Sequence, residues 1–285
     1  MSKMHEKMLQ DMQLRGFSPN TQRTYFNHLR HFETFFQKPA KQLGQEDLRS
    51  YLLHLITVKK VSGEYVDSVY SALKFFYENT LGRTWNMKEI PRLKRTQKLP
   101  VVLSRKEIRQ LLAVTTNLKF KAMFMSAYAA GLRVNEIAHL KISDIDSENM
   151  QILVCQGKGN IDRYTLLSPL HLETLRRYYR QYRPQEWLFP GKLPGQPIRT
   201  RAIQDAFLKM RNKAGINKKA TIHSLRHSFA THLLENGTDI VRIQRLMGHA
   251  HISTTLAYLQ VAKVKILQVK SPLDLLNKED DKDES

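Results

Sequence analysis

Four residues in the C-terminal part of the sequence could act together on a phosphodiester. His223 and Arg226 stand three residues apart in HSLRH, and a helix over this segment places their side chains on one face. His249 follows a second helical segment, and Tyr258 lies nine residues after it. Such a His and Arg pair alone is most often a solvated surface pair. The four residues therefore indicate a site only if short helices fold them around one point.

Two basic residues upstream extend this set. Arg133 lies at an expected helix break near Gly131, and Lys158 occupies the tip of a Gly-Lys-Gly turn. A lysine between glycines has an exposed ammonium that can reach across a groove. The same turn is also typical of an ordinary β-hairpin with no further role.

Cleavage of a DNA phosphodiester needs charge neutralisation, a nucleophile and a proton donor, and these side chains can supply all three if they meet. The planar guanidinium groups of Arg133 and Arg226 match the non-bridging oxygens. Tyr258 has an ordinary pKa of about 10 and needs a base or a positive field to remove its proton. Either histidine can accept that proton or hold an oxygen, and Lys158 can protonate the leaving group. A covalent phosphotyrosine keeps the bond energy, so no metal, ATP or other cofactor is expected.

The composition favours a polyanionic partner. The 285 residues include 46 Lys and Arg against 26 Asp and Glu, a formal net charge of +20. An excess of this size is typical of proteins that bind nucleic acid, and we expect double-stranded DNA as the partner. A basic protein charged for solubility, or one bound to anionic lipid, is the alternative. The length accommodates two ordinary domains.

The single cysteine and the N-terminal segment bear on the compartment. Cys155 alone cannot form an intramolecular disulfide, which is typical of a reducing compartment. The first residues, MSKMHEKMLQDMQLRG, lack an apolar signal core, and no stretch approaches the roughly 20 apolar residues that span a bilayer. We therefore expect a soluble cytoplasmic protein.

Residues 1–90 are expected to form a small all-helical domain. Ser18 followed by Pro19 predicts a helix start, and apolar residues recur at helical spacing through SPNTQRTYFNHLRHFETFF, QEDLRSYLLHLITVK and SGEYVDSVYSALKFFYENTLG. The aromatic side chains of the first segment are expected in the core rather than stacked on bases: Tyr25, Phe32, Phe35 and Phe36. Basic side chains between them are expected to point outward, toward phosphates or simply toward solvent: Arg23, His28, Arg30 and His31.

Residues 91–102 are expected to be a basic linker, because the helical period is lost there among prolines and basic residues. The second domain, 103–285, begins with a capping box formed by Ser104 and Glu107. Helical segments then flank one β-hairpin, formed by QILVCQ and DRYTLLSP. The sequence thus predicts a mostly α fold with a small β-sheet in the second domain.

The second domain resembles the tyrosine recombinase (phage integrase) family. The resemblance lies in IHSLRHSFATHLLENGTDIVRIQRLMGHAHISTTLAYLQ, AAGLRVNEIAHLKISDID and the QGKGN turn. It implies that Tyr258 is the nucleophile and that five residues assist it: Arg133, Lys158, His223, Arg226 and His249. It also implies that Glu136 and Asp144 support Arg133, for which a plain salt bridge is the alternative. Met247 stands where the family usually has leucine, a change that conserves volume.

The resemblance also implies an assembly on DNA. The N-terminal segment is similar to the four-helix core-binding (SAM-like) domain of the family, so a C-shaped clamp around duplex DNA is expected. Four protomers would hold two crossover sites and exchange strands through a four-way junction. The segment after Tyr258, VAKVKILQVKSPLDLL, is similar to that of integron and transposon integrases, where a final helix packs into a neighbouring protomer. This favours a mobile-element integrase over a chromosome-dimer resolvase.

Three other interpretations have distinct signatures. A DNA-binding module without turnover would lack the nucleophile or an arginine, whereas all six positions are filled here. A type IB topoisomerase would share the chemistry but need neither a defined DNA sequence nor a tetramer. A metal-dependent nuclease is suggested by a run of histidines: His223, His227, His232, His249 and His251. Of these, His227 and His251 are expected to be structural. The sequence contains no His-Glu-x-x-His motif and no cysteine pair to support it.

Overall fold

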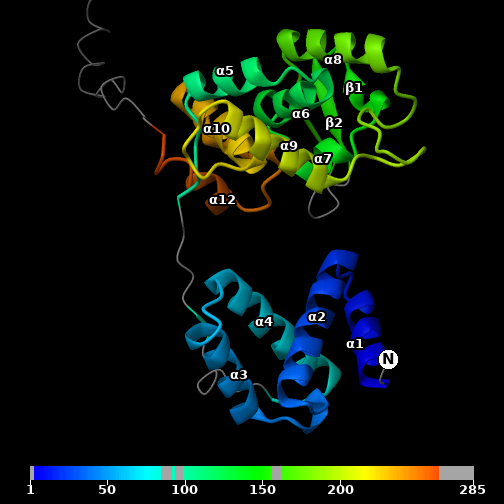
Figure 1. The fold of residues 1–285 in the computed structure, drawn as a ribbon, viewed down its shortest axis with the longest axis vertical. Coiled ribbons are helices and arrows are strands. Elements are labelled where there is room, and N and C mark those ends of the chain that lie inside the picture. Colours follow the sequence, from blue (N-terminus) through cyan, green and yellow to red (C-terminus); the bar gives the residue numbers. More distant parts are fainter. Residues whose placement is uncertain (1–2, 85–91, 94–98, 156–161, 263–285) are drawn as a thin grey trace, which may run out of the picture. The chain divides into compact units, whose positions relative to one another are not determined.

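The computed structural model describes residues 3–84, 92–93, 99–155 and 162–262. The chain divides into two compact units, residues 1–98 and 99–285 (Figure 1). Part of the expected linker, and the whole Gly-Lys-Gly turn with Lys158, lie outside the described residues. Within the described ranges, no helix combines the length and the apolar character that crossing a membrane requires.

The N-terminal unit consists of helices, as the sequence predicts. Its elements are α1 (Lys3–Leu14), α2 (Pro19–Phe36), a 3₁₀ turn η1 (Ala40–Gln42), α3 (Gln45–Thr57), α4 (Gly63–Phe75) and a π-helical turn η2 (Phe76–Thr80). Ser18 caps α2 by accepting a hydrogen bond from the Thr21 backbone N–H, with Pro19 at the first helical position. Helix α2 packs along α4, and their apolar faces meet α1 and α3 in one core.

Two expectations for α2 are wrong in detail. Phe32 is fully buried as expected, but Phe35 is 42% exposed and lies against the Tyr51 and His54 rings of α3. His28, expected to point outward, is buried, and its Nε2 lies 3.0 Å from Ser68 Oγ. Because α2 packs against α4 as well as α3, its buried face extends beyond its large apolar residues and includes His28.

The C-terminal unit is built around helix α6. Its helices are α5 (Arg105–Val114), α6 (Leu118–Ala129), α7 (Val134–Ala138), α8 (Pro169–Tyr182), α9 (Thr200–Lys213), α10 (Ile222–Glu235), α11 (Ile240–Met247) and α12 (Ile252–Leu256). Helix α6 is apolar on most sides and contacts α8, α9 and α10, which explains its continuous burial (Figure 1). The predicted capping box at Ser104 and Glu107 opens α5.

A small antiparallel sheet lies beside these helices. The 3₁₀ turn η3 (Ile142–Asp144) leads into β1 (Ile145–Asp146), which pairs with β2 (Gln151–Val154), and β2 pairs with β3 (Arg163–Leu166). Ile152 lies opposite Thr165 in this register, so Arg163 and Thr165 share the inner face of β3. Thr165 donates a hydrogen bond to the Ala130 carbonyl at the end of α6. The predicted hairpin strands and the mostly α fold are thereby confirmed.

Candidate active site

Arg133 is positioned by the break between α6 and α7. Gly131 has φ +65°, and a Cβ there would lie 2.5 Å from the Phe229 ring, so only glycine fits this turn. The turn makes Arg133 the N-cap residue of α7. Its Nη1 donates to Glu136 Oε1 at 2.7 Å, and its Nη2 donates to the Gly248 carbonyl at 3.1 Å. The side chain is 23% exposed, so an anion can approach the guanidinium.

Arg226 lies deeper, on the buried face of α10. Its side chain is 4% exposed and donates hydrogen bonds to the Gly131 and Met247 carbonyls. Burial, followed by the charge of Arg133, lowers the pKa of Arg226 to about 9. Because Arg133 lies close by and water has limited access, the positive charge of the Arg226 guanidinium is only partly balanced. An anion such as a phosphate would relieve that imbalance.

Glu136 is the carboxylate on which the cations of the site converge. Its Oε2 accepts hydrogen bonds from the Arg133 backbone N–H at 2.7 Å and from Arg163 Nη2 at 2.8 Å, while Arg226 Nη1 lies 3.7 Å away. Burial alone would raise the pKa of Glu136, but the hydrogen bonds and charge of Arg163 and its other partners lower it to about 2. Glu136 is therefore ionised, and it offsets one charge out of three arginines.

His249 follows the glycine that ends α11. Its Nε2 lies 3.2 Å from Arg226 Nη2, and its Nδ1 lies 2.9 Å from Thr255 Oγ1. Because arginine can only donate, Nε2 accepts, and the hydrogen-bond network assigns the ring proton to Nδ1. Burial and then the charges of Arg226 and Arg133 lower the pKa of His249 to about 3. The imidazole is thus neutral near pH 7, with its Nε2 lone pair on the side of Arg226.

Tyr258 lies in a turn just beyond α12, which ends at Leu256. Its residue surface is 3% exposed, and it packs in an apolar cluster with Phe229 and Met247. Its Oη lies 3.1 Å from His227 Nδ1, and its ring is nearly parallel to that of His249 at a centroid distance of 6.2 Å. Burial raises the pKa of Tyr258, against the opposing charges of the two site arginines.

The other two predicted site residues, His223 and Lys158, are not part of this hydrogen-bonded group as described. His223 is exposed in the first turn of α10, one turn before Arg226. Partial removal from water, then the charges of Arg226 and Arg133, lower the pKa of His223. Lys158 lies outside the described residues, between strands β2 and β3. Five of the six predicted residues can therefore be placed, and Arg133, Arg226, His249 and Tyr258 are linked directly or through one neighbour.

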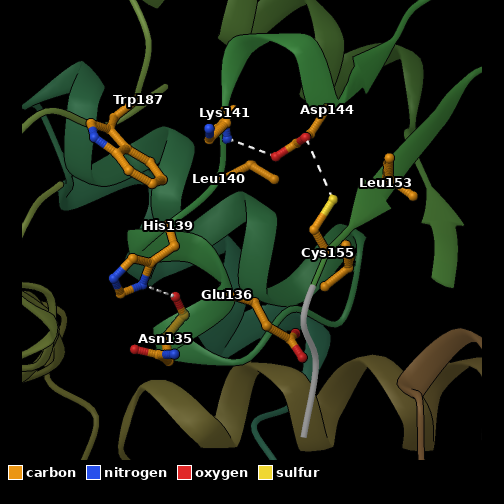
Figure 2. A pocket seen from close by; sticks show the side chains of 10 residues that line it. Asn135, Glu136, His139, Leu140, Lys141, Asp144, Leu153, Cys155 and Trp187 are labelled. Carbon is orange, nitrogen blue, oxygen red and sulfur yellow. Dashed lines mark hydrogen bonds between the residues drawn. The ribbon is translucent and has the colours of Figure 1, made fainter. Parts of the chain in front are cut away.

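An open cleft borders Glu136 on the side of the sheet (Figure 2). It is lined by Asn135 and His139 after the start of α7, by Cys155 at the end of β2, and by Trp187. Asp144, expected to support Arg133, instead accepts a hydrogen bond from the Lys141 backbone N–H at 2.8 Å and lies near the Cys155 thiol. Asp144 thus caps the turn into β1, and Glu136 alone of the two contacts Arg133.

The described residues contain no group of three or more His, Cys, Asp or Glu side chains that could hold a metal ion. The histidines of the run near α10 have other neighbours. His227 and His249 contact Tyr258 and Thr255, and His232 Nδ1 lies 3.0 Å from Tyr128 Oη. These three histidines are thus engaged with hydroxyl groups of other residues.

Comparison with known proteins shows the family of this chain. Residues 101–265 match the phage integrase family, and residues 4–87 match the phage integrase N-terminal SAM-like domain. The chain belongs to the phage integrase family of tyrosine recombinases. This protein is therefore an enzyme, a site-specific recombinase. Its N-terminal unit is the SAM-like domain that the sequence predicts.

Individual relatives span most of the recombinase. It is 44% identical over 277 residues to the integrase/recombinase y4qK of Sinorhizobium fredii, covering 97% of this chain and 90% of that protein. It is 34% identical over 271 residues to the tyrosine recombinase XerC of Lactobacillus leichmannii, covering 87% and 90%. The structure of the XerH recombinase bound to a palindromic difH substrate has a TM-score of 0.71 at 23% identity, covering 87% and 78%, and shows the common fold.

Sequence reasoning missed three residues of this candidate site. Arg163 binds Glu136 with both ends of its guanidinium, Thr255 orients His249, and His227, expected to be structural, holds the Tyr258 hydroxyl. His227 could have been found by its place one residue after Arg226. Arg163 and Thr255 carry no such signal, because an arginine in a strand and a threonine in a helix are common surface residues.

Proposed function

We propose that this recombinase cuts and rejoins double-stranded DNA through a covalent 3′-phosphotyrosine at Tyr258. The observation that carries the proposal is the grouping of Arg133, Arg226 and His249 around Glu136 and the end of α11, with the Tyr258 ring next to His249. Three arginines against one carboxylate leave a net positive charge in a partly water-excluded site. A phosphodiester is the anion that suits it.

In the proposed cleavage step, the arginines, the tyrosine and the lysine each have a separate task. Arg133 and Arg226 hold the non-bridging oxygens of the scissile phosphate, with Arg226 turning its Nη2 from His249 toward the phosphate. Tyr258 Oη attacks phosphorus as the bond to the 5′ oxygen breaks, and Lys158 gives that oxygen a proton. The products are a 3′-phosphotyrosine and a 5′-hydroxyl. Attack by a 5′-hydroxyl on the phosphotyrosine reverses the step without ATP or a metal.

A histidine receives the phenolic proton in this scheme. Lowered pKa values keep both His223 and His249 neutral near pH 7, so either has a ring nitrogen that can accept it. The Tyr258 hydroxyl lies 3.1 Å from His227 Nδ1, and burial raises the pKa of the phenol, which favours its protonated form. Approach of the phosphate to the arginines then activates a nucleophile that is otherwise unreactive.

The proposal extends to the assembly. Residues 1–90 would hold one face of the DNA and residues 103–285 the other, which the basic excess of the chain supports. Four protomers would join two sites through a four-way junction and exchange their C-terminal segments. The segment after Tyr258, which is similar to that of integron and transposon integrases, favours a mobile-element enzyme, and we expect it to act on DNA in the cytoplasm.

A suicide-substrate assay tests the core of the proposal. Wild type and Tyr258→Phe are incubated in EDTA with DNA that carries the ends of the native element and a nick that traps the cleaved strand. We expect a covalent protein–DNA adduct with wild type and none with the variant. An adduct in the variant would show that Tyr258 is not the nucleophile. Tight binding without any adduct would favour a binding module, and activity that EDTA abolishes would favour a metal-dependent nuclease.

A second assay separates recombination from relaxation. A supercoiled plasmid without the native site should stay supercoiled, whereas a plasmid with two sites should recombine. Relaxation of any plasmid by the monomer would instead identify a type IB topoisomerase.

A further inference from the structure

Arg163 is a buried cation to which the proposed cleavage step gives no task. Its side chain is 8% exposed on the inner face of β3. Nη1 and Nη2 donate to the two oxygens of Glu136 at 3.0 and 2.8 Å, and Nε donates to the Leu246 carbonyl at 3.0 Å. All three nitrogens of the guanidinium are thus engaged with protein acceptors. These contacts connect Arg163 to Glu136 and to the end of α11.

The partners of Arg163 are the groups that orient both site arginines. Glu136 also accepts from Arg133 Nη1, and the end of α11 supplies carbonyls to Arg226 at Met247 and to Arg133 at Gly248. Arg163 therefore joins α7 to the last turn of α11. The absence of a side chain at Gly248 makes this possible, because a Cβ there would lie 2.7 Å from Arg163 Cδ.

We propose that Arg163 is a positioning residue for strand cleavage, which holds Glu136 and the end of α11 so that Arg133 and Arg226 meet the scissile phosphate in one fixed arrangement. This inference rests on the proposed function. Without Arg163, Glu136 would lose its bidentate partner and the Leu246 carbonyl would lose its donor. Both supports of Arg133 would then be free to shift.

Charge gives Arg163 a second effect on the same arginines. With Arg163 present, one carboxylate is shared among three guanidinium groups, so Arg133 keeps attraction for an incoming phosphate. Without Arg163, Glu136 would pair more completely with Arg133 and compete with the phosphate for it. The fork geometry matters as well, since lysine offers a point charge and cannot bind two oxygens and a carbonyl in one plane.

The test compares two substrates in single-turnover cleavage. One is the ordinary suicide substrate, and the other carries a methylphosphonate at the scissile position, which removes the negative charge that the arginines must hold. We expect Arg163→Met to slow cleavage of the ordinary substrate by roughly 10²-fold, the loss typical of a misplacement of about 1 Å, with DNA affinity unchanged. On the methylphosphonate the loss should fall below about tenfold, because clamping the phosphate contributes less there.

A matched control separates positioning from general destabilisation. Arg211 is also partly buried and donates to a backbone carbonyl, that of Ala220 at 3.0 Å, but it contacts none of the groups around Glu136. Arg211→Met should leave the ratio of the two cleavage rates at the wild-type value. If Arg163→Met does not fold, Arg163→Lys keeps the charge and most of the aliphatic stem, and it should show the same substrate-dependent loss.

The outcomes are distinct. Equal losses on both substrates, a loss no larger than that of Arg211→Met, or full activity in Arg163→Lys would overturn the positioning role while leaving Tyr258 as nucleophile. If wild type forms no adduct with the ordinary substrate, the proposed function fails, and this inference fails with it.

Discussion

Replacement of Gly248 by alanine should damage the site more than it damages the helix that Gly248 ends. Gly248 has φ +60°, a conformation that costs an L-residue about 1–2 kcal/mol. Its new Cβ would also lie 2.7 Å from Arg163 Cδ and 2.9 Å from Arg163 Nε. Arg163 cannot yield without losing its bonds to Glu136 and Leu246, so overpacking adds about 1–3 kcal/mol.

Gly215→Ala provides the matched control for this prediction. Gly215 follows α9 with φ +68°, and no atom lies within 4 Å of a Cβ built there. Urea unfolding should therefore show a loss of about 1–2 kcal/mol for Gly215→Ala, and a further loss of about 1–3 kcal/mol for Gly248→Ala. Cleavage by the folded Gly248→Ala variant should fall roughly 10²-fold, and cleavage by Gly215→Ala should not fall. Equal stability and equal cleavage rates in the two variants would refute the reasoning.

Three further predictions concern the groups around Tyr258. Arg226→Lys should reduce single-turnover cleavage by about 10²–10³-fold, because an ammonium cannot reproduce the fork, while DNA binding by gel shift persists. The lowered pKa of His249 means that the unfolded chain binds its proton more readily, so this contribution to stability is complete above pH ~6.5 and is lost as pH falls toward 3. His249→Gln should flatten the dependence of unfolding free energy on pH in that window, and an unchanged slope would contradict the assignment. Tyr258→Phe should lose the His227 hydrogen bond and about 0.5–1.5 kcal/mol of stability, measured by urea unfolding, with no adduct formed.

Much of the fold follows from signals that act over a few residues. The cap at Ser18, the capping box at Ser104 and the paired strands around the Gly-Lys-Gly turn form as the sequence predicts. Each depends on hydrogen bonds or periodicity within one segment, which local sequence specifies. The mostly α fold with a small sheet follows from the same local rules.

Errors arise where packing against a distant element decides the outcome. His28 is buried because α4 covers it and supplies Ser68, forty residues away in sequence. Phe35 is left partly exposed against the edge of α3. Asp144 serves its own turn rather than Arg133, a choice that depends on where the chain goes after α7. Helical spacing describes one helix and does not reveal how many neighbours that helix meets.

The sequence by itself indicated six candidate residues, because their order and spacing resemble one enzyme family: Arg133, Lys158, His223, Arg226, His249 and Tyr258. Only the tertiary structure decided how they are held: Arg163 from β3 meets Glu136 from α7 and the end of α11, across eighty-three residues between Arg163 and Leu246. The physical reason is that a buried guanidinium must find an acceptor for each of its donors. Which carbonyls and carboxylates accept from the guanidinium depends on how distant parts of the chain fold together, and local sequence does not specify this.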